Sequence, residues 1–216
     1  MGRERRLSKG HGLNETVNAN QRRYNIARFN ARCDDGTLGG TYAPRNSEGQ
    51  GRGRMTVLDA TESSVNTAYM SMAYELDLCD IRDTAAMLGV RTGDGEPLPY
   101  NPATVLGARE VTPLSMAGAF GGFANNGTYC RPIAIISVTD GTGTPLPKPE
   151  ADCQQVLDPQ VAAQVSYALN GAYTSGTGRR IPGIGRPAAG KTGTTNDSTE
   201  TWFVGYTPQG LSTAAW

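Results

Sequence analysis

The stretch GRPAAGKTGTT, residues 185–195, contains a lysine that suits two different kinds of chemistry. Counted from Gly185, it reads G-x-x-x-x-G-K-T, the pattern of a loop whose backbone N–H groups hold a phosphate at the start of a helix. Counted from Lys191, it reads K-T-G-T, which on a strand would present an ammonium and hydroxyls, with Gly193 letting a substrate backbone lie close. The predicted secondary structure on either side of the motif shows which of these two patterns applies.

The flanking sequences do not suit a phosphate loop, which needs a buried strand before it and a helix after it. TSGTGRRIPG, just before Gly185, has no apolar run, and GTTNDSTETW, after Thr192, has no apolar stripe. We therefore expect a strand at Lys191 and no nucleotide binding. K-T-G is a motif of serine enzymes that transfer acyl groups, but three residues alone are a weak signal.

A second pattern, Ser64-Val65-Asn66, lies about 125 residues before the lysine in ESSVNTAYM. One interpretation is a helix cap, since Ser64 or Asn66 can cap a helix that starts at Thr67. Taken alone, the pattern favours the cap. Its order and separation carry more weight, because Ser-x-Asn comes first, at the junction of two helical segments, and K-T-G follows about 125 residues later on a predicted strand.

Four segments have the pattern of a helix, with apolar residues at helical spacing and Gly or Pro near their ends. They are residues 57–77 with a break at 63–66, residues 80–90, residues 111–127 and residues 158–173. Asp80, Thr112 and Asp158 are the expected N-caps, and proline follows the last two at the first helical position. Gly89 and Gly127 are the expected helix stops.

Strands are predicted mainly at the end of the chain. IAIISVTD, residues 133–140, is expected to be a strand that leads into a turn at DGTGTP, and three β-like runs follow at 187–195, 201–209 and 211–216. Helices followed by consecutive strands with short turns favour an α+β fold, in which an antiparallel sheet packs on helices.

Composition excludes several classes of protein. The 216 residues carry 20 basic and 20 acidic side chains, so no nucleic-acid partner is expected. Residues 1–54 hold eleven Lys and Arg against five acids, which we interpret as a solvated face. The start, MGRERRLSKGHGL, has no apolar segment of a signal peptide, and no apolar run approaches the ~20 residues that span a bilayer.

The four cysteines, Cys33, Cys79, Cys130 and Cys153, form no C-x-x-C pair, and His11 is the one histidine. A zinc site is therefore not expected. Three disulfide connectivities are open. Cys130 and Cys153 flank a predicted hairpin and are the favoured pair, while four reduced buried thiols remain an equal alternative.

Three stretches together resemble the transpeptidase domain of class A (bifunctional) penicillin-binding proteins. They are MTVLDATESSVNTAYM, LGAREVTPLSMAGAFGGFANNGTYCRPIAIISVTDGTG and AAGKTGTTNDSTETWFVGYTPQ. The resemblance covers most of residues 7–216, and the cysteines with NETVNANQRR resemble the actinobacterial branch. It implies a transpeptidase-like α/β/α sandwich, with an antiparallel sheet flanked by helices. Residues 1–54 would be a loop-rich N-terminal part and residues 55–216 the penicillin-binding transpeptidase domain, incomplete at both ends.

The resemblance implies peptidoglycan cross-linking. A serine attacks the D-Ala-D-Ala amide of a stem peptide, D-Ala leaves, and the acyl group passes to an amine of a neighbouring strand; β-lactam antibiotics trap the serine. By this resemblance Ser64 and Lys191 relay the proton toward the leaving amine, and Asn66 hydrogen-bonds the lysine of the nucleophile motif and the substrate amide. Thr192, Gly193 and Thr194 bind the substrate, with the threonines at its carboxylate. No metal and no cofactor are implied.

The chain departs from the family in one respect. The family's nucleophile lies in S-x-x-K, and no serine of this sequence has a lysine three residues on. The adjacent pair Ser8-Lys9 cannot replace it, because neighbouring helix residues do not face each other. We therefore expect a fragment that lacks its nucleophile segment and is inactive alone. The alternative is a non-catalytic module that binds peptidoglycan or a partner. Either would lie at the extracytoplasmic face of the cell membrane, with any anchor outside this chain.

Overall fold

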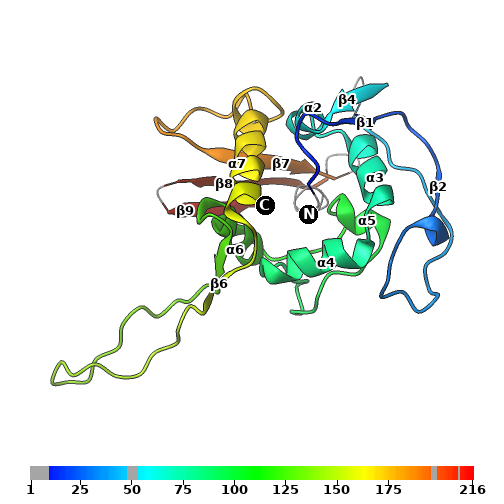
Figure 1. Cartoon of the computed structure of the whole chain (residues 1–216). Helices are drawn as coiled ribbons and strands as arrows, with labels where there is room; N and C mark the ends of the chain where they lie inside the picture. Colours follow the sequence, from blue (N-terminus) through cyan, green and yellow to red (C-terminus); the bar gives the residue numbers. More distant parts are fainter. Residues whose placement is uncertain (1–9, 48–52, 196–198, 209) are drawn as a thin grey trace.

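The computed structural model describes residues 10–47, 53–195, 199–208 and 210–216. Up to residue 56 the described chain is mostly extended and forms two small antiparallel sheets. Strand β1 (Thr16–Asn18) pairs with β4 (Arg54–Thr56), β2 (Tyr24–Asn25) pairs with β3 (Thr41–Tyr42), and the 3-10 turn η1 (Ile26–Arg28) follows β2. This part wraps around the outside of helix α3, as Figure 1 shows. The predicted loop-rich start is thus pinned by short strand pairs.

Helices α2 (Val57–Glu62) and α3 (Asn66–Glu75) are separated by a turn at the predicted break. Helix α4 (Leu78–Met87) follows, and α5 (Pro102–Val105) is one short turn. The prediction that Asp80 caps α4 is wrong. Asp77 is the cap and accepts from the N–H groups of Cys79 and Asp80, while Asp80 is buried in the first turn. Gly89 has a left-handed φ of +78° just beyond α4, as expected of a helix stop.

Helices α6 (Pro113–Ala124) and α7 (Pro159–Thr174) begin at the predicted caps. The side chain of Thr112 accepts from the N–H of Ser115, and that of Asp158 accepts from the N–H of Gln160. Both helices start with proline, whose missing N–H would have no partner inside the helix.

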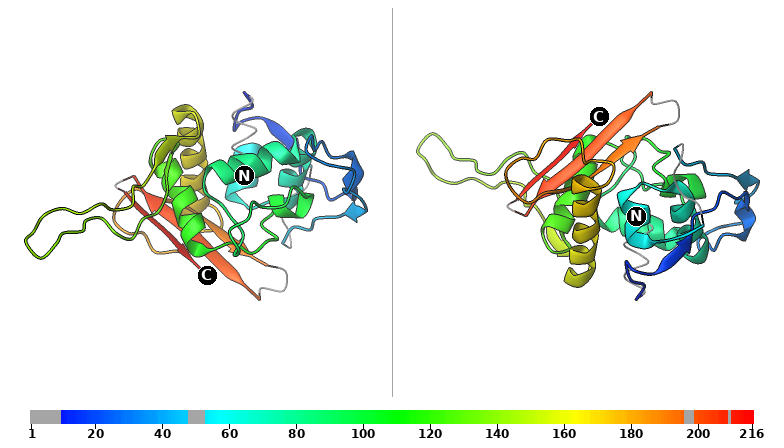
Figure 2. Two further views of the ribbon diagram at one scale, coloured as in Figure 1. Left: turned by 90° about the horizontal axis from the view of Figure 1, so that it is seen from below. Right: turned by 90° about the horizontal axis from the view of Figure 1, so that it is seen from above.

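The C-terminal sheet is antiparallel and has the order β7-β8-β9. Its strands are β7 (Ala189–Thr194), β8 (Thr201–Thr207) and β9 (Leu211–Ala215), which confirms the three predicted runs. Helices α6 and α7 pack on the same face of this sheet (Figure 2). Their buried side chains form one cluster with Ala189 and Tyr206 of the sheet.

The predicted α/β/α sandwich around one sheet is only partly right. The described chain forms four separate antiparallel sheets, three of two strands and one of three. Mixed helices and antiparallel strands are present, but the strands are divided among small sheets. The short strands β2 and β3 pack through their side chains on helices α3 and α4, and they do not extend the C-terminal sheet.

Strands β5 (Thr128–Cys130) and β6 (Cys153–Gln155) form a short hairpin base closed by the Cys130–Cys153 disulfide. This confirms the favoured cysteine pair. The prediction of a strand at 133–140 is wrong: residues 131–152 form a long arm that projects from the body (Figure 1) and has one isolated bridge, Thr139 to Pro145. Its apolar Ile136 is 79% exposed, so no core fixes this segment as a strand.

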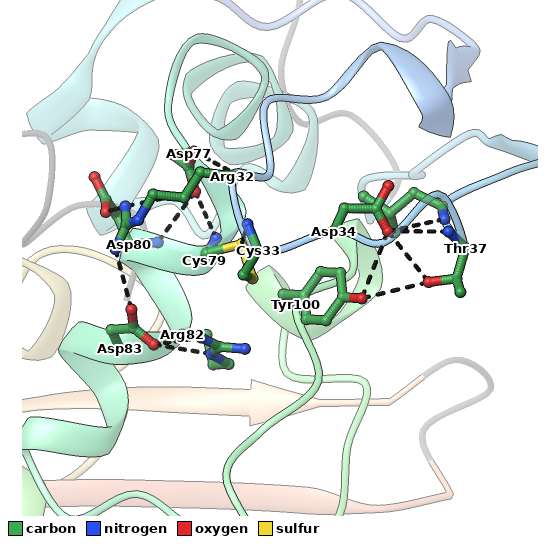
Figure 3. Close-up of a disulfide and its surroundings, with 11 residues drawn as sticks. Arg32, Cys33, Asp34, Thr37, Asp77, Cys79, Asp80, Arg82, Asp83 and Tyr100 are labelled. Carbon is green, nitrogen blue, oxygen red and sulfur yellow. Dashed lines mark hydrogen bonds and ion pairs between the residues drawn. A yellow bond between two sulfur atoms is a disulfide. The ribbon is translucent and has the colours of Figure 1, made fainter.

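A second disulfide, Cys33–Cys79, attaches the N-terminal part to the start of α4 (Figure 3). Beside it the Arg32 guanidinium makes ion pairs with Asp80 and, at 3.2 Å, with Asp83. The backbone N–H of Arg32 also donates to the Asp77 side chain. These contacts fix the loop between β2 and β3 against the helices.

Candidate active site

Ser64 lies half-buried in the turn between α2 and α3. Its φ is +55°, a left-handed value that is uncommon for a residue with a side chain. Its N–H donates to the Thr61 carbonyl, and the next N–H, of Val65, donates to Ala60. The Val65 side chain is fully buried and anchors the turn. Such backbone strain is typical of functional sites and persists only where the surroundings enforce it.

Lys191 lies on β7 opposite Val204 of β8, and its side chain reaches the turn. Its ammonium donates to the Ser64 hydroxyl and, at 3.0 Å, to the Thr192 carbonyl oxygen. Burial disfavours the charged form and lowers the pKa of Lys191 from 10.5 to about 8. The structure thus brings together the lysine and the serine of two motifs that are far apart in the sequence.

Strand β7 is an edge strand, and its geometry orients the rest of the K-T-G motif. The N–H of Thr195 donates to the Glu200 carbonyl, so residues at alternate positions of β7 bond to the neighbouring strand. By this alternation, Thr192 and Thr194 turn their backbone groups to the open edge. The Thr192 carbonyl indeed bonds to Lys191 there. Gly193 and Thr194 are exposed and Thr192 is half-buried.

Asn66 lies at the start of α3, and its carboxamide donates to the Arg45 carbonyl at 2.8 Å. The hydrogen bonds of the described residues do not connect it to Lys191. The helix itself is capped from a distant segment. The Asn46 side-chain oxygen accepts from the N–H of Thr67, while the apolar N-cap Val65 makes no side-chain bond. A capping side chain 21 residues away in the sequence has no local signal, and the sequence did not reveal it.

The loop after α7 holds the two motifs together. The N–H of Thr177 donates to the Glu62 carbonyl at the end of α2, and its hydroxyl lies 2.7 Å from the Thr192 hydroxyl. The approach is close: a Cβ at Gly176 would lie 2.2 Å from the Glu62 carbonyl oxygen. The three atoms nearest a Cβ at Gly171 would all belong to the Glu62 side chain, with its carboxylate end the nearest. Thr177 was not predicted from the sequence, where its one local signal is its place between two glycines.

This geometry contradicts the interpretation of residues 185–192 as a phosphate-binding loop. Lys191 and Thr192 lie inside β7, and a strand, not a helix, follows the glycine-rich stretch. In the described part of the chain, no group of three or more His, Cys, Asp or Glu residues could hold a metal ion. His11 pairs with Glu15 at 3.0 Å.

The model of the "Penicillin binding protein transpeptidase domain" family matches residues 26–215. The chain belongs to this family. Penicillin-binding protein 1A of Aquifex aeolicus is 33% identical over 183 residues, which are 84% of this chain and 24% of the relative. Penicillin-binding protein 1A of Mycolicibacterium smegmatis is 33% identical over 190 residues, with 79% of this chain and 24% of the relative covered. The chain thus spans about a quarter of these family members, which are class A proteins.

Solved structures show the same fold. PonA1 of Mycobacterium tuberculosis superposes with a TM-score of 0.78 at 27% identity, over 99% of this chain and 56% of that one. The same protein has been solved in complex with penicillin V, with a TM-score of 0.75. Penicillin-binding protein 1A of Haemophilus influenzae shares the fold, with a TM-score of 0.77 at 22% identity over 98% of this chain and 35% of that one. None of the helices in the described ranges is both long and apolar enough to cross a bilayer.

Proposed function

We propose that this chain supplies the Ser-x-Asn turn and the K-T-G strand of a D,D-transpeptidase site for peptidoglycan stem peptides. The observation that carries the proposal is the hydrogen bond from the Lys191 ammonium to the Ser64 hydroxyl. It joins two motifs separated by 127 residues into one site. The family membership and the penicillin complex of PonA1 support the same reading.

In this site Ser64 acts as a proton relay. With a pKa of about 8, Lys191 is about nine-tenths protonated at pH 7, so it donates to Ser64. The Ser64 hydroxyl then accepts from the lysine and keeps its own hydrogen free to donate to a second partner. When the nucleophilic serine attacks the penultimate D-Ala carbonyl, its proton passes through Ser64 to the nitrogen of the departing D-Ala. The C–N bond breaks and an ester forms.

The open edge of β7 binds the end of the stem peptide. The hydroxyls of Thr192 and Thr194 donate to the terminal carboxylate, and the nearby Lys191 cation attracts it. The outward N–H of Thr194 provides one donor for the oxyanion. Losing one such donor typically reduces the rate by ~10²–10³-fold. Asn66 meets the substrate amide after releasing the Arg45 carbonyl.

The nucleophile is the part that the sequence does not contain, because no serine is followed by lysine at the third position. We propose that the chain alone binds stem peptides and does not become acylated. Intact mass after incubation with benzylpenicillin tests this. We expect no added mass, and a stoichiometric adduct on Ser64 would contradict its role as a relay.

A non-catalytic module that binds peptidoglycan or a partner is the second candidate, favoured by the missing S-x-x-K. The two candidate functions differ in whether the stereochemistry of the bound peptide matters. A transpeptidase site prefers diacetyl-L-Lys-D-Ala-D-Ala over the same peptide ending in L-Ala-L-Ala, and Thr194→Val weakens binding of the first. Equal affinity for both peptides, unaffected by Thr194→Val, would favour the module. Dissociation constants from NMR titration provide the readout.

A further inference from the structure

Thr177 contacts the candidate site although it belongs to neither motif. Its hydroxyl oxygen lies 2.7 Å from that of Thr192, the middle residue of K-T-G, and either hydroxyl can be the donor. Both side chains are half-buried. A contact this short is a full hydrogen bond, so exactly one of the two hydrogens is used in it.

The direction of that bond decides what Thr192 can bind. A threonine hydroxyl has one hydrogen and two lone pairs. If Thr177 donates, Thr192 keeps its hydrogen for a ligand and acts as a donor, which suits a carboxylate. If Thr192 donates to Thr177, it can offer a ligand only lone pairs, which repel a carboxylate and suit an amide N–H.

We propose that Thr177 is a positioning residue that makes the site selective for peptides ending in a free carboxylate, because its hydroxyl donates to Thr192 and turns the Thr192 hydrogen outward. This inference rests on the proposed function and deepens it. The carboxylate completes a chain of donors, Thr177 to Thr192 to ligand, in which each bond polarises and strengthens the next.

The backbone holds Thr177 in the position that this role needs. Its N–H donates to the Glu62 carbonyl at 3.0 Å. The glycines on either side allow close approach, since a Cβ at Gly176 would lie 2.2 Å from that carbonyl oxygen and one at Gly178 would lie 3.0 Å from the Tyr173 Cα. The hydroxyl is therefore presented from a fixed backbone, and a ligand does not have to order it.

The test compares two probes and three proteins. The probes are diacetyl-L-Lys-D-Ala-D-Ala and the same peptide with a C-terminal primary amide, which is uncharged and carries its own N–H donors. The proteins are the unchanged chain, Thr177→Val, which keeps the branched shape without the hydroxyl, and Thr177→Ser, which keeps the hydroxyl. The readout is the ratio of the dissociation constants of amide and carboxylate, measured by NMR titration.

The unchanged chain is expected to prefer the carboxylate. Loss of one hydrogen bond that orients a ligand donor should reduce this preference by about threefold to tenfold in Thr177→Val. Thr177→Ser should restore it, and affinity for the amide should not fall in either variant. A structural role alone would weaken both probes together. If Thr177→Val does not fold, Thr177→Ala removes the same donor and takes its place.

Two outcomes overturn the inference, and they differ in what they say about the proposed function. If the unchanged chain prefers the carboxylate and Thr177→Val prefers it equally, Thr177 does not set the selectivity, and the proposed function stands. If the unchanged chain binds neither probe, or binds both equally, the carboxylate site itself is absent and both proposals fail.

Discussion

Replacing Lys191 by methionine should change how stability depends on pH. In the folded chain burial lowers the pKa of Lys191 from 10.5 to about 8. The unfolded chain therefore binds more protons than the folded chain between about pH 8 and 10.5, and this lysine makes stability rise with pH in that window. Below pH 8 the folded protein carries the full cost of a buried ammonium.

The size of the effect follows from the shift. A difference of one pKa unit corresponds to about 1.4 kcal/mol, so the change from 10.5 to about 8 corresponds to about 3 kcal/mol. The free energy of unfolding of Lys191→Met minus that of the unchanged chain should fall by this amount between pH 7 and pH 10.5. Tyr42 and Tyr129, whose pKa values burial raises, titrate in both proteins and cancel in the difference.

Urea unfolding at several pH values measures this difference, and NMR of chain labelled with ¹³C at the lysine Cε gives the pKa directly. The sequence has three lysines, so the spectrum is simple, and Lys191→Met assigns the signal. A Lys191 signal that titrates near 10.5, together with a stability difference that does not vary with pH, would refute the argument. The ammonium would then be in water and not against Ser64.

Three further predictions concern the elements that hold the site. Gly176→Ala should lower the free energy of unfolding by about 1–3 kcal/mol, because its Cβ meets backbone atoms, and the Tm by about 2–10 °C. Gly171→Ala is the control and should lower the Tm less, because its Cβ meets a side chain that can move. A calorimetric scan in which both variants lose the same Tm would contradict this. Asn46→Ala should cost about 1 kcal/mol, since α3 loses its cap, and Asn46→Asp should cost less in urea unfolding; equal costs would exclude capping. Changing Cys33 and Cys79 together to serine should cost about 2–4 kcal/mol in the same assay, and an unchanged midpoint would show that the bridge does not stabilise the chain.

Features with local causes were predictable from the sequence. The caps at Thr112 and Asp158 and the stop at Gly89 depend on residues within one helical turn, and all three were confirmed. The cap of α4 was misplaced because Asp77 and Asp80 both suit the role locally. Asp77 comes directly before the first helical residue, and the ion pair with Arg32 holds Asp80 inside the first turn.

Features with distant causes were not predictable from local patterns. The arm of residues 131–152 contains the apolar run IAIISVTD that predicted a strand, but most of its residues are exposed and no core fixes it. The Asn46 cap and the contact between Thr177 and Thr192 join segments that the fold alone brings together. Lys191 and Ser64 were expected to meet only because the chain resembles a known family, and the structure places them in contact.

The most direct test of the central claim is an NMR map of where a stem peptide binds. ¹⁵N-labelled chain is titrated with diacetyl-L-Lys-D-Ala-D-Ala, and the amide signals are followed to saturation. A site between the Ser64 turn and the open β7 edge predicts the largest shifts at Ser64, Thr192, Gly193 and Thr194. Saturable shifts confined to other elements, such as the 131–152 arm, or no saturable shift at all, would contradict the claim that this site binds the D-Ala-D-Ala end.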